Sequence, residues 1–198
     1  MWRYNSSEVD AITPTRGLDM ASAASGVRPS ARLCHTGSAP AIISTDGVNA
    51  AVGATTEMYV AEMFVPATCL VTGIAVFNGS NVTDDVKGGI YDSAGTLIRA
   101  TASTQQSGAD AYQLVPFATG PTGAAATTVV LPGPATYYIG LCYDGTTSTL
   151  QTFGTGVFGA GKLTGLVYAT NFAASGTALT ITPPTTFTTL LGPLASLY

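Results

Sequence analysis

Residues 135–143 read Ala-Thr-Tyr-Tyr-Ile-Gly-Leu-Cys-Tyr, the clearest strand signal in the chain. Successive side chains of a β-strand point to opposite faces, so this segment has two apolar faces. The first face carries Tyr137, Ile139, Leu141 and Tyr143, and the second carries Tyr138, Gly140 and Cys142. Two apolar faces are typical of a central strand that is covered on both sides. The turn residues Pro132-Gly133-Pro134 lead into this strand.

Short runs of strand-forming residues recur before and after this segment, separated by Gly, Pro, Asn and Asp. Residues 92–95, Asp-Ser-Ala-Gly, separate two of these runs and are typical of a hairpin with a type I turn. No window shows the spacing of an amphipathic helix. We therefore predict an all-β protein, an antiparallel β-sandwich with the connections of a jelly roll. The further predicted strands are 57–65, 69–77, 86–91, 96–101, 112–117, 127–131, 149–153, 163–168 and 177–182.

The first part of the chain lacks this regular punctuation. Residues 1–50 hold four basic and four acidic side chains and no sustained hydrophobic period. We predict an extended N-terminal arm over residues 1–54 and a β-domain over residues 55–198. The single tryptophan, Trp2, lies at the tip of the arm beside Arg3 and Tyr4, which is the composition of an interface anchor. Packing of this tip on its own domain is an equally weighted alternative.

The composition excludes several classes of protein. Of the 198 residues, 9% are charged, against roughly 25% in an average soluble chain, so charge-driven disorder is excluded for most of the sequence. Seven Lys and Arg face eleven Asp and Glu, which excludes a basic nucleic-acid binder. No run of about 20 apolar residues predicts a membrane helix, and the N-terminus has no apolar leader. We therefore expect a protein made in a cytoplasm, without nucleic-acid or membrane partners.

Two glycine-rich matches to nucleotide-binding motifs are weak. Residues 154–159 fit the dinucleotide pattern, but neither a helix pattern nor an acidic residue follows, and that motif requires both. Residues 156–162 nearly fit a P-loop, but Leu163 stands where a hydroxyl group must hold magnesium. A glycine-rich loop between strands is the favoured interpretation, and we predict no cofactor.

Cysteine and histidine form no recognisable site. Cys34 precedes His35, the single histidine, and adjacent residues of an extended chain point opposite ways. No second histidine exists to complete a metal or nucleophile site. Cys69 and Cys142 lie in apolar runs and are predicted to be small buried hydrophobes.

The carboxylates allow two hypotheses, neither of which the spacing favours. Asp84 and Asp85, with Asn78 and Asn81, offer oxygen ligands for Ca²⁺, but a solvated turn is the favoured interpretation. Carboxylates from distant strands, such as Asp92 and Asp110, offer a glycosidase pair, but nothing in the spacing selects them. We predict no metal site, no catalytic residue and no enzymatic activity.

Tyrosines offer flat surfaces for binding a sugar. Most of them lie inside the predicted strands, where packing in the core is the favoured fate. The tyrosines considered are Tyr59, Tyr91, Tyr112, Tyr137, Tyr138, Tyr143 and Tyr168.

The last 36 residues, 163–198, carry no charge. An exposed surface normally carries interspersed charges, so we expect this end to be covered by its own sandwich or by neighbouring subunits. Together with the aromatic tip of the arm, it leads to the hypothesis that both ends of the chain contact other subunits. The predicted contact residues are Trp2, Arg3, Tyr4, Phe187, Leu190, Leu191 and Tyr198.

Several segments of residues 55–198 resemble a recurrent domain of tailed-phage virion proteins. They include PGPATYYIGL at 132–141 and the segments 58–67, 71–79, 90–95, 181–188 and 191–193. The resemblance implies a β-sandwich component of the virion: a capsid decoration (cement) protein, a head fibre or a tail-associated module. It also implies the major capsid protein or other virion subunits as partners, and a homo-oligomer such as a trimer. The alternative is a glycan- or receptor-binding module of a phage fibre or tail.

Overall fold

The computed structural model describes residues 48–152, 164–168, 180–186, 188 and 190–198, the backbone alone at 164–168. These residues form thirteen strands and no helix. The strands are β1 Val48–Ala51, β2 Glu57–Val65, β3 Cys69–Val71, β4 Gly73–Phe77, β5 Asp85–Tyr91, β6 Leu97–Thr101, β7 Thr104–Gln105, β8 Tyr112–Thr119, β9 Val129–Leu131, β10 Ala135–Tyr143, β11 Thr149–Thr152, β12 Thr164–Tyr168 and β13 Ala195–Leu197. No helix in this part of the chain is long and apolar enough to cross a membrane.

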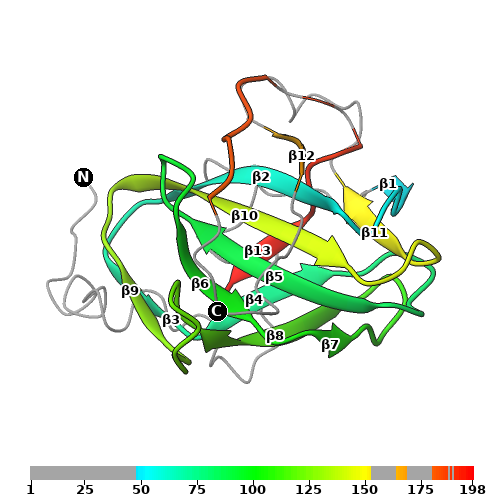
Figure 1. Ribbon diagram of the computed structural model, residues 1–198, viewed down its shortest axis with the longest axis horizontal. Helices are drawn as coiled ribbons and strands as arrows, with labels where there is room; N and C mark the ends of the chain where they lie inside the picture. Colours follow the sequence, from blue (N-terminus) through cyan, green and yellow to red (C-terminus); the bar gives the residue numbers. More distant parts are fainter. Residues whose placement is uncertain (1–47, 153–163, 169–179, 187, 189) are drawn as a thin grey trace, which may run out of the picture.

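The main sheet is antiparallel and curls over on itself (Figure 1). Its strand order is β12-β2-β10-β5-β6-β8-β4-β13, and β7 pairs with β5 beside this path. Register shifts at Ile90/Tyr91 and at Ala100/Thr101 accompany the bend, as β-bulges do. Two ribbons, β1–β11 and β3–β9, complete the fold. The prediction of an all-β antiparallel sandwich is confirmed, and the jelly-roll connection stays a prediction.

Strand β10 lies where its sequence places it, between β2 and β5. Its predicted inner face, which includes Ile139 and Leu141, is buried in the main core. That core also takes side chains from the opposing strands, including Ile74 of β4 and Phe117 of β8. The other face of β10 belongs to a second core with Met58, Val60, Tyr91, Leu97, Tyr138 and Cys142.

The second core is closed by the C-terminal segment 180–186. Ile181 is buried there, and its N–H donates a hydrogen bond to the Gly95 carbonyl at 2.8 Å. Gly140 has no space for a side chain, because an added Cβ would meet the Met58 sulfur and the Tyr91 ring. This covering layer explains why both faces of β10 are apolar.

Predicted and observed strands differ at a few places. The predicted strand 69–77 is interrupted at Thr72, where the chain passes from the β3–β9 ribbon into the main sheet. Thr180 forms a single bridge with Thr96, and 177–179 lie outside the described residues. β1, β7 and β13 were not predicted. Within the stretch assigned to the arm, β1 pairs with β11 and Val52 is buried, while residues 1–47 lie outside the described part.

Candidate interaction surface

Four of the seven predicted contact residues, Trp2, Arg3, Tyr4 and Phe187, lie outside the described residues. Of the other three, Leu190 is 42% exposed, whereas Leu191 packs against the main core. The ring of Tyr198 covers Gly73, and its carbonyl accepts a hydrogen bond from the Thr72 N–H at 2.7 Å.

The neutral C-terminal residues 192–197 are therefore buried in their own sandwich. Strand β13 forms an edge of the main sheet, and Ala195 and Leu197 are core residues. The sequence predicted that this segment is covered either by its own sandwich or by neighbouring subunits, and residues 192–197 are covered by their own sandwich.

Carboxylates gather at the end of the molecule where β10 finishes, and there they anchor turns. The Asp84 carboxylate accepts hydrogen bonds from the backbone N–H groups of Thr147 and Ser148, at 3.0 and 2.8 Å, and from the Thr147 hydroxyl. Burial alone would raise the pKa of Asp84, but these hydrogen bonds outweigh it and lower the pKa. Asp84 thus fastens the β10–β11 loop to the β4–β5 loop.

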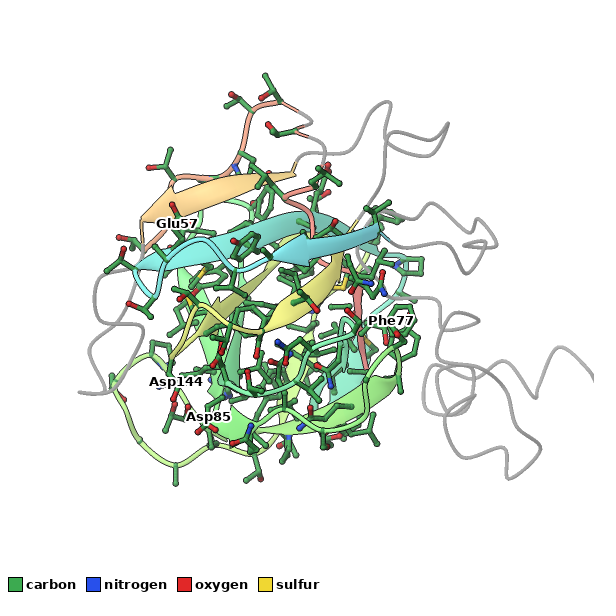
Figure 2. All side chains as sticks on the ribbon, turned by 90° about the vertical axis from the view of Figure 1, so that its right-hand side faces the viewer. Glu57, Phe77, Asp85 and Asp144 are labelled. Atoms are coloured by element: carbon green, nitrogen blue, oxygen red, sulfur yellow. The ribbon has the colours of Figure 1, made fainter. Side chains whose placement is uncertain are left out.

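Asp85 and Asp144 lie close together at this end, as Figure 2 shows, with Glu57 further along the same side. The Asp85 N–H donates to Asp144 Oδ1 at 2.7 Å, and the Ser103 hydroxyl donates to Asp85 Oδ2 at 3.3 Å. Among the described residues, no group of three or more His, Cys, Asp or Glu could hold a metal ion.

The amides considered as calcium ligands also bind groups of their own chain. Asn78 is fully buried, its Nδ2 donates to Gln113 Oε1 at 2.9 Å, and its Oδ1 accepts from Gln106 Nε2 at 3.0 Å. Asn81 Nδ2 donates to the Thr147 carbonyl at 2.7 Å. These hydrogen bonds form a network that joins loops, and the burial of Asn78 differs from the solvated turn that was the favoured interpretation.

The carboxylates of Asp92 and Asp110 are not brought together. Asp92 Oδ1 accepts hydrogen bonds from the N–H groups of Ala94 and Thr96 in the β5–β6 turn. Asp110 binds Gln151 near the other end of β5, whose seven residues span about 20 Å. A glycosidase pair requires carboxylates within about 10 Å of each other.

The tyrosines considered as sugar platforms mostly lie in the cores. Those buried are Tyr59, Tyr91, Tyr137, Tyr138 and Tyr143. Tyr112 is partly exposed and stacks on Phe77 with ring centroids 4.6 Å apart, and the side chain of Tyr168 lies outside the described part.

Cys69 and Cys142 are buried and form no disulfide, which confirms the prediction that both are small buried residues. Burial raises the pKa of Cys142 to about 12, so this thiol carries no nucleophilic thiolate at neutral pH.

An exposed, uncharged surface lies on the outside of the β3–β9 ribbon. Along residues 68–72 and 128–132, exposed and covered side chains alternate, so each strand shows one face to solvent. Leu70 and Val130 are directly opposite each other and are 62% and 57% exposed. We call this surface the ribbon face, and it comprises Thr68, Leu70, Thr72, Thr128, Val130 and Pro132.

The ribbon face is held rigidly by the layer beneath it. Cys69, Val71 and Leu131 anchor its inner side in the main core. At the end of the ribbon, the turn that holds Gly133 lies so close to the backbone of Ala67 that a Cβ at Gly133 would collide with it. The Gly133 N–H also donates to Thr68 Oγ1 at 3.2 Å. Leu70 and Val130 therefore project from a fixed support.

The β3–β9 ribbon and the end of β10, where Asp84, Asp85 and Asp144 gather, lie at opposite ends of the molecule (Figure 1). Pro132 is near the start of β10 and Asp144 follows its end, and nine strand residues span about 30 Å. Arg99 lies beside the ribbon face, since its Nε donates to the Thr128 carbonyl at 3.1 Å. The sequence did not predict this surface, because residues 69–71 and 129–131 are continuous apolar runs in which the exposed positions cannot be told from the buried ones.

Comparison of the chain with protein-family models, curated proteins and solved structures found no match.

Proposed function

We propose that this protein is a non-enzymatic structural component of a phage virion, a capsid decoration protein that binds and stabilises neighbouring subunits. The observation that carries the proposal is the ribbon face, an uncharged and partly apolar surface on a rigid support. Such a surface binds another protein with little loss of conformational entropy, because its backbone is already fixed. The resemblance of residues 55–198 to domains of phage virion proteins is the reason for assigning the protein to a virion.

The chemistry of the ribbon face fits a protein contact. Burial of exposed Leu and Val side chains contributes about 25 cal/mol per Å² of apolar surface. The flanking threonines of the ribbon face provide hydroxyl groups for a polar rim, as interfaces between proteins have. The alternative of a glycan-binding module loses most of its support, because five of its seven tyrosines are buried.

Binding to particles tests the proposal. Capsids of the phage that carries the gene, assembled without this protein, are mixed with the purified full chain and separated on a density gradient. We expect saturable binding with a fixed number of copies per capsid and a higher temperature of capsid disruption. Protein that stays at the top of the gradient at every concentration contradicts the proposal.

Deletion of residues 1–47 tests the part assigned to the arm, which lies outside the described residues. If the arm anchors the protein, the shortened chain occupies fewer capsid sites. Full occupancy without the arm contradicts this assignment.

A further inference from the structure

We propose that the ribbon face is a contact between two copies of this chain, packed across a two-fold axis. The inference rests on the proposed function and names a second copy of this chain as the neighbouring subunit that the ribbon face contacts. Attachment to the capsid itself is therefore assigned to the arm, residues 1–54, and not to this face. It depends on three features of the described residues: the pairing of Leu70 with Val130, the distribution of charge, and the prolines at the ribbon's end.

The first feature is self-complementarity. In a two-fold contact, residue i of one copy meets residue j of the other, and j meets i. Leu70 and Val130 are neighbours in register and similarly exposed, so a second ribbon face lets each leucine pack on the other copy's valine. Thr72 and Thr128 are exposed at one end of this pair, and Thr68 and Pro132 at the other, so they extend the contact without charge.

The second feature is charge. The chain has a formal net charge of −4, so two copies repel unless they meet away from their carboxylates. Glu57, Asp84, Asp85, Asp110 and Asp144 all lie at the end where β10 finishes, far from the ribbon face. Nearer the ribbon face, the positive charge of Arg99 offsets in part the charges of Asp92, which follows β5, and of Glu62, which pairs with Tyr138. Contact through the ribbon faces therefore places the two acidic ends as far apart as the molecule allows.

The third feature limits how the copies meet. Pro66, Pro132 and Pro134 border the ribbon, and proline has no N–H to donate to an added strand. Addition of a strand beyond the end of the ribbon is disfavoured at these positions, and the proposed contact is the packing of the two exposed faces. Such a contact closes with two copies and does not propagate into a fibre.

The test measures the mass of the full-length chain by sedimentation equilibrium. We expect twice the 20.0 kDa of one chain. Leu70→Glu and Val130→Lys, each alone, should weaken the dimer at least ~10-fold, because each places a charge in an apolar contact. The matched control is Val48→Glu, which places the same carboxylate on a 41% exposed residue of β1 and should leave the dimer unchanged.

Mixing the two variants tests the pairing itself. In a mixed dimer, the carboxylate introduced at position 70 faces the ammonium group introduced at position 130, and the second Leu70–Val130 contact stays intact. We expect the mixture to form a mixed dimer, measured by native mass spectrometry, at concentrations where each variant alone is monomeric. Leu70→Ser, a small polar change at an exposed position, is a second variant in case Leu70→Glu fails to fold.

Four outcomes overturn the inference: a monomeric wild type, a trimer, a dimer unaffected by Leu70→Glu, or a mixture that stays monomeric. The capsid-binding experiment is independent of these outcomes. A monomer that binds capsids contradicts this inference and leaves the proposed function standing. A ribbon-face dimer that does not bind capsids contradicts the proposed function and leaves the inference standing.

Discussion

Gly95 is the residue at which the β5–β6 turn meets the C-terminal segment. Its φ of +86° is in the left-handed region, and an added Cβ would collide with the carbonyl oxygen of Ile181. Gly108, at φ +80°, is also left-handed, but an added Cβ there meets the Ala111 side chain at 3.4 Å. Alanine at either glycine introduces backbone strain, but only alanine at Gly95 also collides with the C-terminal segment, so comparison of the two variants isolates the effect of that collision.

We predict that Gly95→Ala lowers the free energy of unfolding by more than Gly108→Ala does. Both variants incur about 1 kcal/mol of backbone strain. Gly95→Ala must also displace Ile181 from the second core, and the cost of opening a buried site brings its total to about 3 kcal/mol. Urea denaturation of the two variants measures the difference. Equal losses would show that the C-terminal segment contributes little to covering the second core.

Asp84 is the other residue whose role follows from its contacts. Because its folded pKa is lowered, it stabilises the fold above its unfolded pKa of about 4, and this contribution is lost as pH falls through the lower folded pKa. We predict that Asp84→Asn costs about 1 kcal/mol at neutral pH, a modest value because the group is partly exposed. Thermal unfolding from neutral pH to about pH 2 should show the gap to wild type closing. A gap that is constant with pH would exclude the carboxylate's charge as its cause.

At the scale of elements, strand β13 shows how the uncharged C-terminus is used. Leu197 is 3% exposed and belongs to the main core, although no strand was predicted there. We predict that Leu197→Ala costs about 3 kcal/mol of unfolding free energy, because it removes a buried side chain and leaves a cavity. Leu190→Ala, at a 42% exposed position, is the control and should cost less than about 0.5 kcal/mol. Chemical denaturation measures the free energy of unfolding of both variants. Similar small decreases for both would mean that the last strand is not part of the core.

The sequence predicted those elements that repeat a local pattern. β2 and β10 have the predicted bounds because their apolar residues alternate without interruption. β1 and β13 escaped prediction because each is short and is defined by a distant partner, β11 for the first and β4 for the second. The break at Thr72 has the same origin, since its N–H donates to the carbonyl of Tyr198, 126 residues further along.

The candidate surface was harder to predict than the strands. An exposed Leu70 and a buried Leu131 look alike in sequence, and only the pairing of β3 with β9 shows which faces solvent. The side of the sheet that the C-terminal segment covers was likewise not readable, because Ile181 is about 40 residues from the nearest strand of the second core that it closes. Two apolar faces on β10 predicted that a cover exists, but not which segment provides it.

At the scale of the whole molecule, charge is separated from the proposed contact, and this makes the salt dependence of assembly diagnostic. The acidic ends of two copies repel weakly over a long range, and this repulsion reaches about 30 Å at 0.01 M salt but only about 10 Å at 0.1 M. The ribbon face contributes through burial of apolar surface, which salt does not screen. Because the two acidic ends lie further apart than this range even in 0.01 M salt, we predict that the dissociation constant of the dimer changes less than about two-fold as sodium chloride rises from 0.01 M to about 0.5 M, measured by sedimentation equilibrium. A contact of the acidic end with a basic surface would instead weaken strongly, because screening weakens attraction between unlike charges. Dissociation of the dimer in high salt would therefore indicate that the contact is made by the acidic end around Asp84, Asp85 and Asp144, and not by the ribbon face.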